Sequence, residues 1–245
     1  MPVCVPDIFG RCSDRCLSSL SASQDADVFR PIAQMVDRIF GCVGAADNER
    51  FVLPTPKYPP DALGDAYPHD LLLAHQHVHE GIVNMLNHMI ERVRSGSWCI
   101  NDRIPRAMVR TLLLWAGEHA LHCLFWRLMS PDPPPDIPDN LGEAMDRQYG
   151  STSAAIKLFA SLCTSIAHRG WGILGLRPDG RLVIFHTGEL VNIQAWPISP
   201  LLVCDMWEHA YEKRYDNDRT GWVNAFLKMV DWKYAAQRYN NISTL

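Results

Sequence analysis

The chain has 245 residues, of which 47% are hydrophobic and 20% charged, a balance typical of globular proteins of one or two domains. Its formal net charge of −4 gives no electrostatic reason to expect nucleic acid or an anionic membrane surface as a partner. The apolar runs are all shorter than the roughly 18 residues that a membrane-spanning helix requires. We therefore expect neither nucleic acid nor a membrane among its partners.

Residues 1–50 are predicted to be an extension ahead of the main body. They carry several aspartates and lack the continuous apolar core of a secretory signal, so a cytoplasmic location is expected. Apolar residues between Val28 and Phe40 recur at helical spacing and predict one amphipathic helix. A packing helix that covers part of the body is the favoured interpretation, and a recruitment helix is the alternative.

Residues 51–130 are predicted to form a helical hairpin domain. A proline-punctuated segment leads into two long helical stretches, at about 70–93 and 105–129, with a break at Ser95-Gly96-Ser97. Two long helices joined by a short break favour an antiparallel pair. The proline-rich stretch 130–138 is the clearest linker in the chain and indicates a domain boundary.

Residues 131–245 are predicted to form an α/β domain. Apolar, β-rich runs surround a Pro-Asp-Gly turn, and a third such run ends near Asp205. The predicted elements are helices at 141–149 and 153–168, strands at 171–176 and 181–186, the strand before Asp205, and helices from about 208 and from 221. The predicted fold class is α+β, with an N-terminal antiparallel helical hairpin and a C-terminal domain that contains a small three-stranded antiparallel sheet.

Asp205 follows directly on the apolar run Leu201–Cys204, and His209 lies four residues after Asp205. A carboxylate and an imidazole in apolar surroundings are costly unless they are satisfied, and a bound cation is a common partner for them. The stretch from Asp205 to Tyr211 reads DMWEHAY and resembles the signature D-x-W-E-H-A-Y of the iron/manganese superoxide dismutase family. The similarity continues to Trp232. It implies that Asp205 and His209 are ligands of iron or manganese.

A second stretch, from Glu118 to Trp126, reads EHALHCLFW and resembles the family's other ligand motif, H-x-L-F-W. This resemblance places His122 at a ligand position. A single histidine on an apolar helix is usually a core residue, but two matched motifs favour the ligand interpretation here. Imidazole and carboxylate ligands suit a metal of this type.

The family's fourth ligand lies on its first long helix, where a ligand His, a second His and a Tyr follow at intervals of four residues. Counting forward from Asp61-Ala62-Leu63, these positions hold His75, His79 and Val83. In this register His75 is the fourth ligand and His79 belongs to the shell around the ligands. His77, on an adjacent face, is a further candidate.

Counting back from the end of the same helix places Ala74, Val78 and Ile82 at these positions instead. The two registers differ by one residue, or about 100° around a helix. In the second register the site has three ligands, and the three apolar side chains line an enlarged pocket. We take His75 as the ligand, while the second register stays open.

The polar groups that the family places around its metal are altered. Neither register has the gateway tyrosine, and the glutamine that hydrogen-bonds the metal-bound water is absent from both places the family uses. Glu118 and about Glu189 occupy those two places, and we predict a catalytic role for them. As a carboxylate, a glutamate would add negative charge and shift the redox potential.

Four other residues match positions near the metal in the family. Trp171 and Trp207 resemble the aromatic walls of the metal pocket, and Tyr211 completes the signature. Glu208 resembles the residue that bridges to a ligand histidine of the partner subunit, which implies a homodimer.

Three hypotheses for the function remain. The first is a diverged dismutase that acts on superoxide, a small-molecule substrate, through metal-centred redox chemistry. The second is an enzyme repurposed from the same scaffold for a larger apolar substrate, for example in secondary metabolism. The third is a non-catalytic structural homologue. Fold alone does not choose among them, because function resides in the site.

Overall fold

The computed structural model describes residues 46–47, 50–95, 106–188 and 198–243. The amphipathic helix expected in the N-terminal extension and the candidate residue Glu189 lie outside the described residues. In chain order the elements are β1 (Ala46–Asp47), β2 (Arg50–Phe51), the short 3-10 helix η2 (Gly64–Ala66), α3 (His69–Arg94), α4 (Arg106–Leu128), α5 (Asp139–Tyr149), α6 (Thr152–Ser165), β3 (Gly170–Leu176), β4 (Leu182–Gly188), β5 (Ser199–Asp205), α7 (Glu208–Tyr215), α8 (Arg219–Met229) and α9 (Trp232–Ser243).

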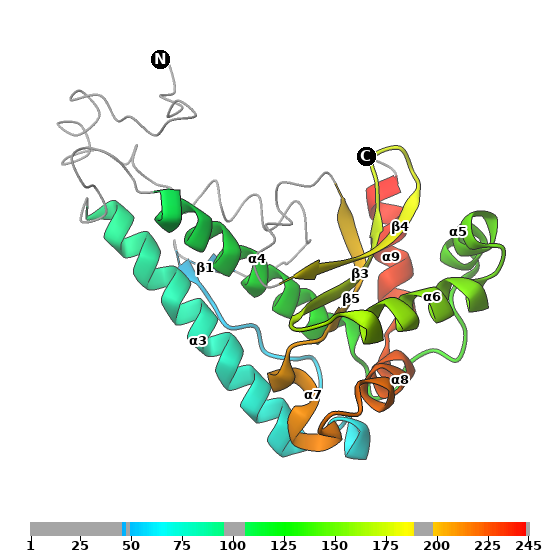
Figure 1. Cartoon of the computed structure of the whole chain (residues 1–245), viewed down its shortest axis with the longest axis horizontal. Helices are drawn as coiled ribbons and strands as arrows, with labels where there is room; N and C mark the ends of the chain where they lie inside the picture. Colours follow the sequence, from blue (N-terminus) through cyan, green and yellow to red (C-terminus); the bar gives the residue numbers. More distant parts are fainter. Residues whose placement is uncertain (1–45, 48–49, 96–105, 189–197, 244–245) are drawn as a thin grey trace.

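The two long helices α3 and α4 pack against each other and run in opposite directions, as predicted (Figure 1). Apolar residues at intervals of three and four give α3 one face that is removed from water. Two histidines occupy core positions on this face. Its buried residues are Leu71, Leu72, His75, His79, Ile82, Val83, Leu86, Met89 and Ile90.

The sheet has the strand order β4-β3-β5, and both pairings are antiparallel. The central strand β3 is buried along its whole length, in keeping with its uncharged sequence GWGILGL. Helix α6 packs on β3 and β4, while α4 and α9 pack on β5 (Figure 1). In the register of the sheet Trp171 lies opposite Asp205, so the end of β5 meets the start of β3 beside α4.

The predicted α+β fold class is confirmed, and most element boundaries differ from the predicted ones by only a few residues. The helix predicted at 153–168 ends at Ser165, because Ile166 adopts an extended conformation. The C-terminal helical segment is divided, since Val230 is extended and the Asp231 carboxylate accepts a hydrogen bond from the backbone N–H of Tyr234 at 3.0 Å. This is an N-cap that starts α9. The division into residues 1–50, 51–130 and 131–245 stays a prediction.

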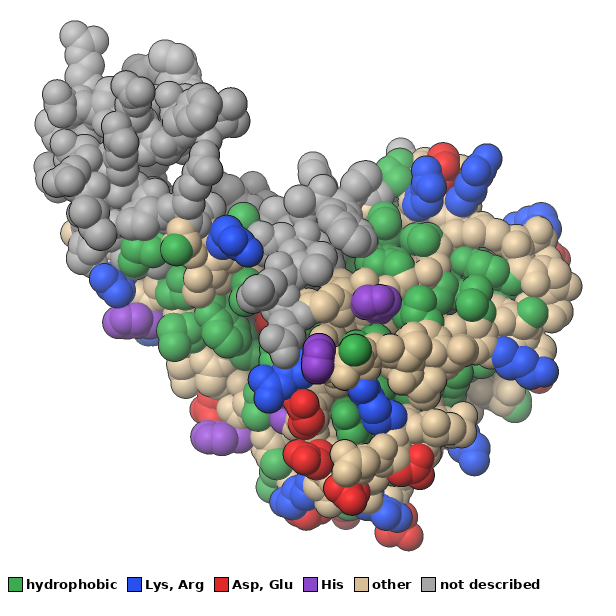
Figure 2. Space-filling view, in the orientation of Figure 1, with side chains coloured by type: hydrophobic (Ala, Val, Ile, Leu, Met, Phe, Trp, Pro, Cys, Tyr) green, Lys and Arg blue, Asp and Glu red, His purple; other side chains and the backbone are tan. Residues whose placement is uncertain are grey.

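Within the described residues, no helix is both long and apolar enough to cross a membrane. On the face drawn in Figure 2, most acidic side chains of these residues lie toward the lower end with basic ones among them, and further basic side chains are spread over the rest of the face. Among the large apolar side chains, Leu73, Met85 and Leu158 are exposed. Isolated exposed apolar residues are ordinary on protein surfaces and need no special explanation.

Gly172 brings β3 into close contact with α6. A Cβ atom at this position would overlap the Sγ atom of Cys163. We expect Gly172→Ala to lower the free energy of unfolding by about 1–3 kcal/mol, since extra volume in a packed core forces side chains to shift. Cys163→Ala in the same chain should restore most of the loss. Urea denaturation measures both effects, with Gly188→Ala as control because an added Cβ there meets no atom of the described residues within 4 Å. Equal losses in the single and double variants would contradict this explanation.

Candidate metal centre

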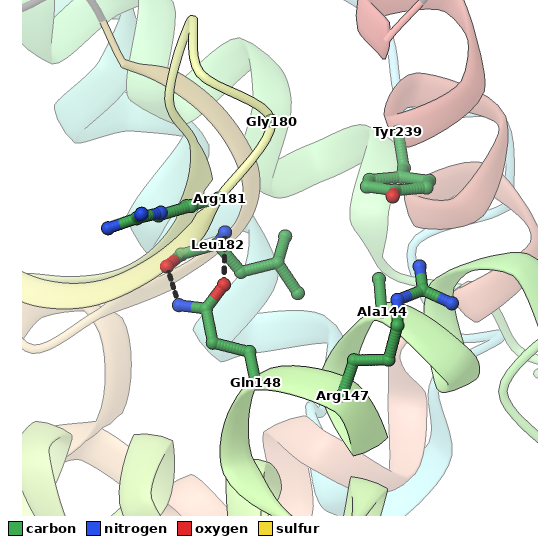
Figure 3. Close-up of a pocket in the computed structure, with 7 residues that line it drawn as sticks. All are labelled: Ala144, Arg147, Gln148, Gly180, Arg181, Leu182 and Tyr239. Carbon is green, nitrogen blue, oxygen red and sulfur yellow. Dashed lines mark hydrogen bonds between the residues drawn. The ribbon is translucent and has the colours of Figure 1, made fainter.

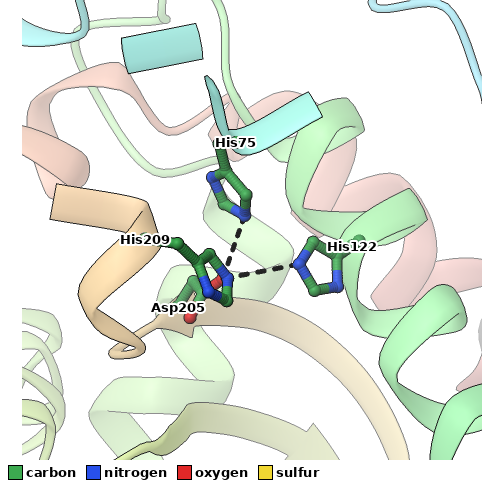
Figure 4. A group of neighbouring side chains, drawn as sticks. All are labelled: His75, His122, Asp205 and His209. Atoms are coloured by element: carbon green, nitrogen blue, oxygen red, sulfur yellow. Dashed lines mark ion pairs between the residues drawn. The ribbon is translucent and has the colours of Figure 1, made fainter. Parts of the chain in front are cut away.

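Four side chains from four different elements converge between the helical hairpin and the sheet (Figure 4). His75 comes from α3, His122 from α4, Asp205 from the last position of β5 and His209 from the first turn of α7. Asp205 Oδ2 lies 3.2 Å from Nε2 of His75, 3.3 Å from Nε2 of His209 and 3.8 Å from Nε2 of His122. The first three side chains are wholly buried, and the His209 side chain is 22% exposed.

The converging atoms are close together but are not satisfied by one another. Oδ2 of Asp205 and Nε2 of all three histidines are buried without a hydrogen bond, although all three distances are within ion-pair range. Two ligand atoms that are each about 2.1 Å from one ion lie roughly 3.0 Å apart at right angles and roughly 3.6 Å apart at trigonal angles. The separations of Asp205 Oδ2 from Nε2 of His75 and of His209, 3.2 and 3.3 Å, lie within this range, and its separation from Nε2 of His122, 3.8 Å, is slightly longer. A cation among the four atoms would satisfy all of them at once.

The protonation states of Asp205, His75 and His122 also suit a metal. Burial raises the pKa of Asp205, but His209 and His75 beside it outweigh that effect and hold this pKa well below its usual value. Burial lowers the pKa of His75, and Asp205 only partly opposes this effect. Burial lowers the pKa of His122 more strongly than that of His75. An ionised carboxylate and neutral imidazoles are the forms that bind metals.

Backbone groups orient two of the four side chains. His122 donates from Nδ1 to the carbonyl oxygen of Glu118 at 2.7 Å, so its Nε2 carries a free lone pair. The backbone N–H of Trp207 donates to Oδ1 of Asp205 at 2.8 Å, which leaves Oδ2 for the centre. Outer hydrogen bonds of this kind set the tautomer and the orientation of metal ligands.

Two residues that the sequence interpretation missed also hold the centre. Tyr67 Oη lies 2.6 Å from Nδ1 of His75, and Trp222 donates from its indole N–H to the carbonyl oxygen of Asp205 at 2.8 Å. Neither residue lies within a recognised ligand motif. The only local signal for Tyr67 is its place two residues before the start of α3.

Glu118 lies at the edge of the same centre and is buried. The Trp171 indole N–H donates to its Oε2 atom at 3.1 Å. Burial, assisted by the nearby Asp205, raises the pKa of Glu118 to about 8, although the Trp171 bond acts in the opposite direction. At neutral pH this carboxyl group is therefore mainly protonated and uncharged. The negative charge expected at this position from the sequence is consequently absent there.

His79 is one of a row of hydrogen-bonded side chains beside the centre. Trp126 donates from Nε1 to Nδ1 of His79 at 3.0 Å, and Nε2 of His79 lies 2.8 Å from Nδ1 of His119. An indole N–H can only donate, so the ring proton of His79 is on Nε2 and points to His119. Cys123 Sγ lies 3.7 Å from both ring nitrogens of His119. A metal bound by His79, His119 and Cys123 would need Nε2 of His79 as a ligand, but this nitrogen carries the ring proton. We therefore interpret the group as structural.

The remaining candidates on α3 point in other directions. Ala74 is exposed, Val78 is half-buried and Ile82 is buried, whereas His75 faces the other three converging side chains. The side chain of His77 is 86% exposed and is not part of the cluster.

Trp207 and Glu208, two other candidate residues of the signature, lie at the surface beside His209. The Trp207 ring stacks on His209, and the Arg169 guanidinium lies over the Trp207 ring. Arg169 also pairs with Glu208 at 2.8 Å within the same chain. Tyr211 is buried.

A separate hollow of about 460 Å³ lies at the turn between β3 and β4 (Figure 3). It contains none of the four converging side chains. Gln148 bonds both backbone groups of Leu182 there, and Arg147 pairs with Glu143. The lining residues are Ala144, Arg147, Gln148, Gly180, Arg181, Leu182 and Tyr239. We interpret these contacts as the attachment of the β3–β4 hairpin to α5.

The protein is an α+β protein in which a helical hairpin packs on a three-stranded antiparallel sheet. Three imidazoles and one carboxylate converge between them, and this set of groups could hold a single metal ion. Residues 137–238 match the family model of iron/manganese superoxide dismutases, C-terminal domain. The chain is 31% identical to the manganese superoxide dismutase of Pseudomonas aeruginosa over 67% of its own length and 84% of that protein. It is 30% identical to the iron superoxide dismutase of Coxiella burnetii, over 66% and 84% of the two chains. It is 31% identical to the mitochondrial manganese superoxide dismutase of Penicillium chrysogenum, over 78% and 94%. The chain belongs to the iron/manganese superoxide dismutase family.

Proposed function

We propose that this protein binds one iron or manganese ion at His75, His122, Asp205 and His209 and disproportionates superoxide. The observation that carries the proposal is the convergence of four buried ligand atoms that lack hydrogen bonds. The relatives named as iron or manganese superoxide dismutases support the choice of metal and of substrate. Neither the repurposed enzyme nor the structural homologue gains support from the comparisons.

The chain's own residues supply the environment of the reaction. When bound, the metal supplies one-electron redox chemistry. Asp205 contributes the single negative charge of the four-residue set, and the neutral imidazoles of His75 and His122 contribute lone pairs. Glu118 holds a proton near neutral pH, and the Trp171 indole orients its carboxyl group beside the centre. Glu118 thus provides a neutral proton donor where the family has a neutral amide.

The direct test combines elemental analysis and a superoxide assay on the same purified sample. We expect close to one iron or manganese per chain and turnover above that of the chelator-treated protein. A sample without either metal would contradict the proposed site. A sample with stoichiometric metal and no turnover would contradict the proposed substrate and leave the metal site intact.

We also propose that the protein acts as a homodimer. His209 is the one partly exposed member of the set, and Glu208 and Trp207 lie on the same surface. Light scattering on the purified protein measures the assembly, and a monomer at working concentration would contradict this proposal. The cytoplasmic location stays a prediction from the sequence.

A further inference from the structure

Tyr67 and His75 form a wholly buried pair. The Tyr67 hydroxyl lies 2.6 Å from Nδ1 of His75, and both side chains are 0% exposed. The Tyr67 ring packs edge-on against Phe125, at 6.3 Å between ring centroids, and lies tilted against Trp222 at 5.5 Å. These neighbours come from α4 and α8, so the hydroxyl group is held in place by segments far apart in the sequence.

The other ligand positions show what such an outer contact does. In His122 the outer nitrogen donates to a carbonyl oxygen, and in Asp205 the outer oxygen accepts from a backbone N–H. Each outer bond leaves the inner atom free to face the centre. Nε2 of His75 likewise faces the centre and makes no hydrogen bond. To bind a cation there, His75 must carry its single ring proton on Nδ1, where the Tyr67 oxygen is the acceptor within reach.

We propose that Tyr67 is a positioning residue, which fixes the ring orientation and the tautomer of His75 so that Nε2 presents its lone pair to the metal. This inference rests on the metal site of the proposed function but not on superoxide as the substrate. A tyrosine hydroxyl serves here as the outer acceptor that a carboxylate or a backbone carbonyl provides in other metal sites.

The test compares Tyr67→Phe with Tyr58→Phe in the full-length protein. Tyr58 is also buried, and its hydroxyl donates to the carbonyl oxygen of Trp126 at 3.2 Å rather than contacting a ligand side chain. Each variant therefore loses one buried tyrosine hydroxyl group. Mn²⁺ affinity, measured by competition with a chelator, should fall by about 10–100-fold in Tyr67→Phe. It should stay within about twofold of wild type in Tyr58→Phe, since no ligand loses its outer partner.

A spectroscopic readout separates positioning from general packing. In the Co²⁺-loaded protein, the visible absorption bands report the geometry of the ligands. We expect these bands to shift in Tyr67→Phe and to stay unchanged in Tyr58→Phe. Equal affinity and an unchanged spectrum in Tyr67→Phe would overturn the role of Tyr67 while leaving the proposed metal site standing.

A measurement on the unsubstituted chain covers the case in which Tyr67→Phe does not fold. The imidazole ¹⁵N shifts of the Zn²⁺-loaded protein identify which nitrogen of His75 carries the proton. A proton on Nδ1 is expected, and a proton on Nε2 would overturn the proposal. Failure of the unsubstituted protein to bind Mn²⁺, Co²⁺ or Zn²⁺ would overturn both this inference and the proposed function.

Discussion

Replacement of His209 by alanine is expected to lower Mn²⁺ affinity by at least about 100-fold, because loss of a ligand costs more than loss of an outer partner. The substitution removes one of the four converging atoms, and it does so at the one partly exposed member of the set. The fold should therefore survive better than after truncation of a wholly buried ligand. Equilibrium dialysis followed by elemental analysis measures the loss.

The matched control is His77→Ala, since this histidine lies on the exposed side of α3. A ligand that binds only the folded state raises the melting temperature in proportion to the logarithm of its concentration. Added Mn²⁺ should therefore raise the melting temperature of wild type and of His77→Ala, and have little effect on His209→Ala. Unchanged metal occupancy in His209→Ala would show that the four-residue cluster is not the metal centre.

Glu118→Gln is expected to remove a large pH dependence from the stability of the metal-free protein. The pKa of Glu118 is raised from 4.5 to about 8 in the folded chain, so the folded state binds this proton more tightly than the unfolded state does. The resulting stabilisation is complete below pH 4.5 and is lost as the pH rises to about 8. A shift of this size corresponds to a change on the order of 5 kcal/mol in the free energy of unfolding.

Chemical denaturation of the metal-free protein between pH 5 and pH 9 tests this expectation. The buried histidines contribute the same pH dependence to both variants, so the stability of wild type relative to Glu118→Gln should fall across this range. Glu118→Gln should be the more stable of the two at pH 9. The glutamine can still accept the hydrogen bond from Trp171 and carries no charge. Glu143→Gln, at an exposed position, is the control and should follow wild type. Parallel curves for wild type and Glu118→Gln would show that the carboxyl group is already ionised at neutral pH.

The same substitution bears on turnover. If Glu118 acts as a neutral proton donor, superoxide turnover by the metal-loaded protein should fall as the pH rises through the pKa of Glu118, which the positive charge of the metal lowers from its metal-free value of about 8. An amide keeps its N–H groups at every pH, so Glu118→Gln should show a flatter profile. Stopped-flow assays at several pH values measure both profiles, and a profile unchanged by the substitution would exclude this role.

The local sequence was sufficient to predict which groups lie close together where those groups are neighbours in the chain. Asp205 and His209 are four residues apart, at the end of β5 and in the first turn of α7, so their proximity was predictable from the sequence, and the resemblance to the family implied that they are ligands. The helices and strands were also predictable, since their apolar periodicity is a local property. The separate helix α9 was missed, because its start depends on a single capping aspartate, Asp231, within a continuous helical pattern.

The register of α3 was open in the sequence, because a shift by one residue changes the direction of a side chain by about 100°. Only packing against α4 and α7 decides the direction, and in the structure His75 faces the centre while Ala74 is exposed. The charge of Glu118 likewise depends on burial beside Asp205, and the role inferred for Tyr67 depends on contacts from α4 and α8. The sequence by itself determined which chemical groups are available and which of them share an element. Their protonation and orientation were decided by the tertiary structure, because both depend on solvent exclusion and on neighbours from distant segments.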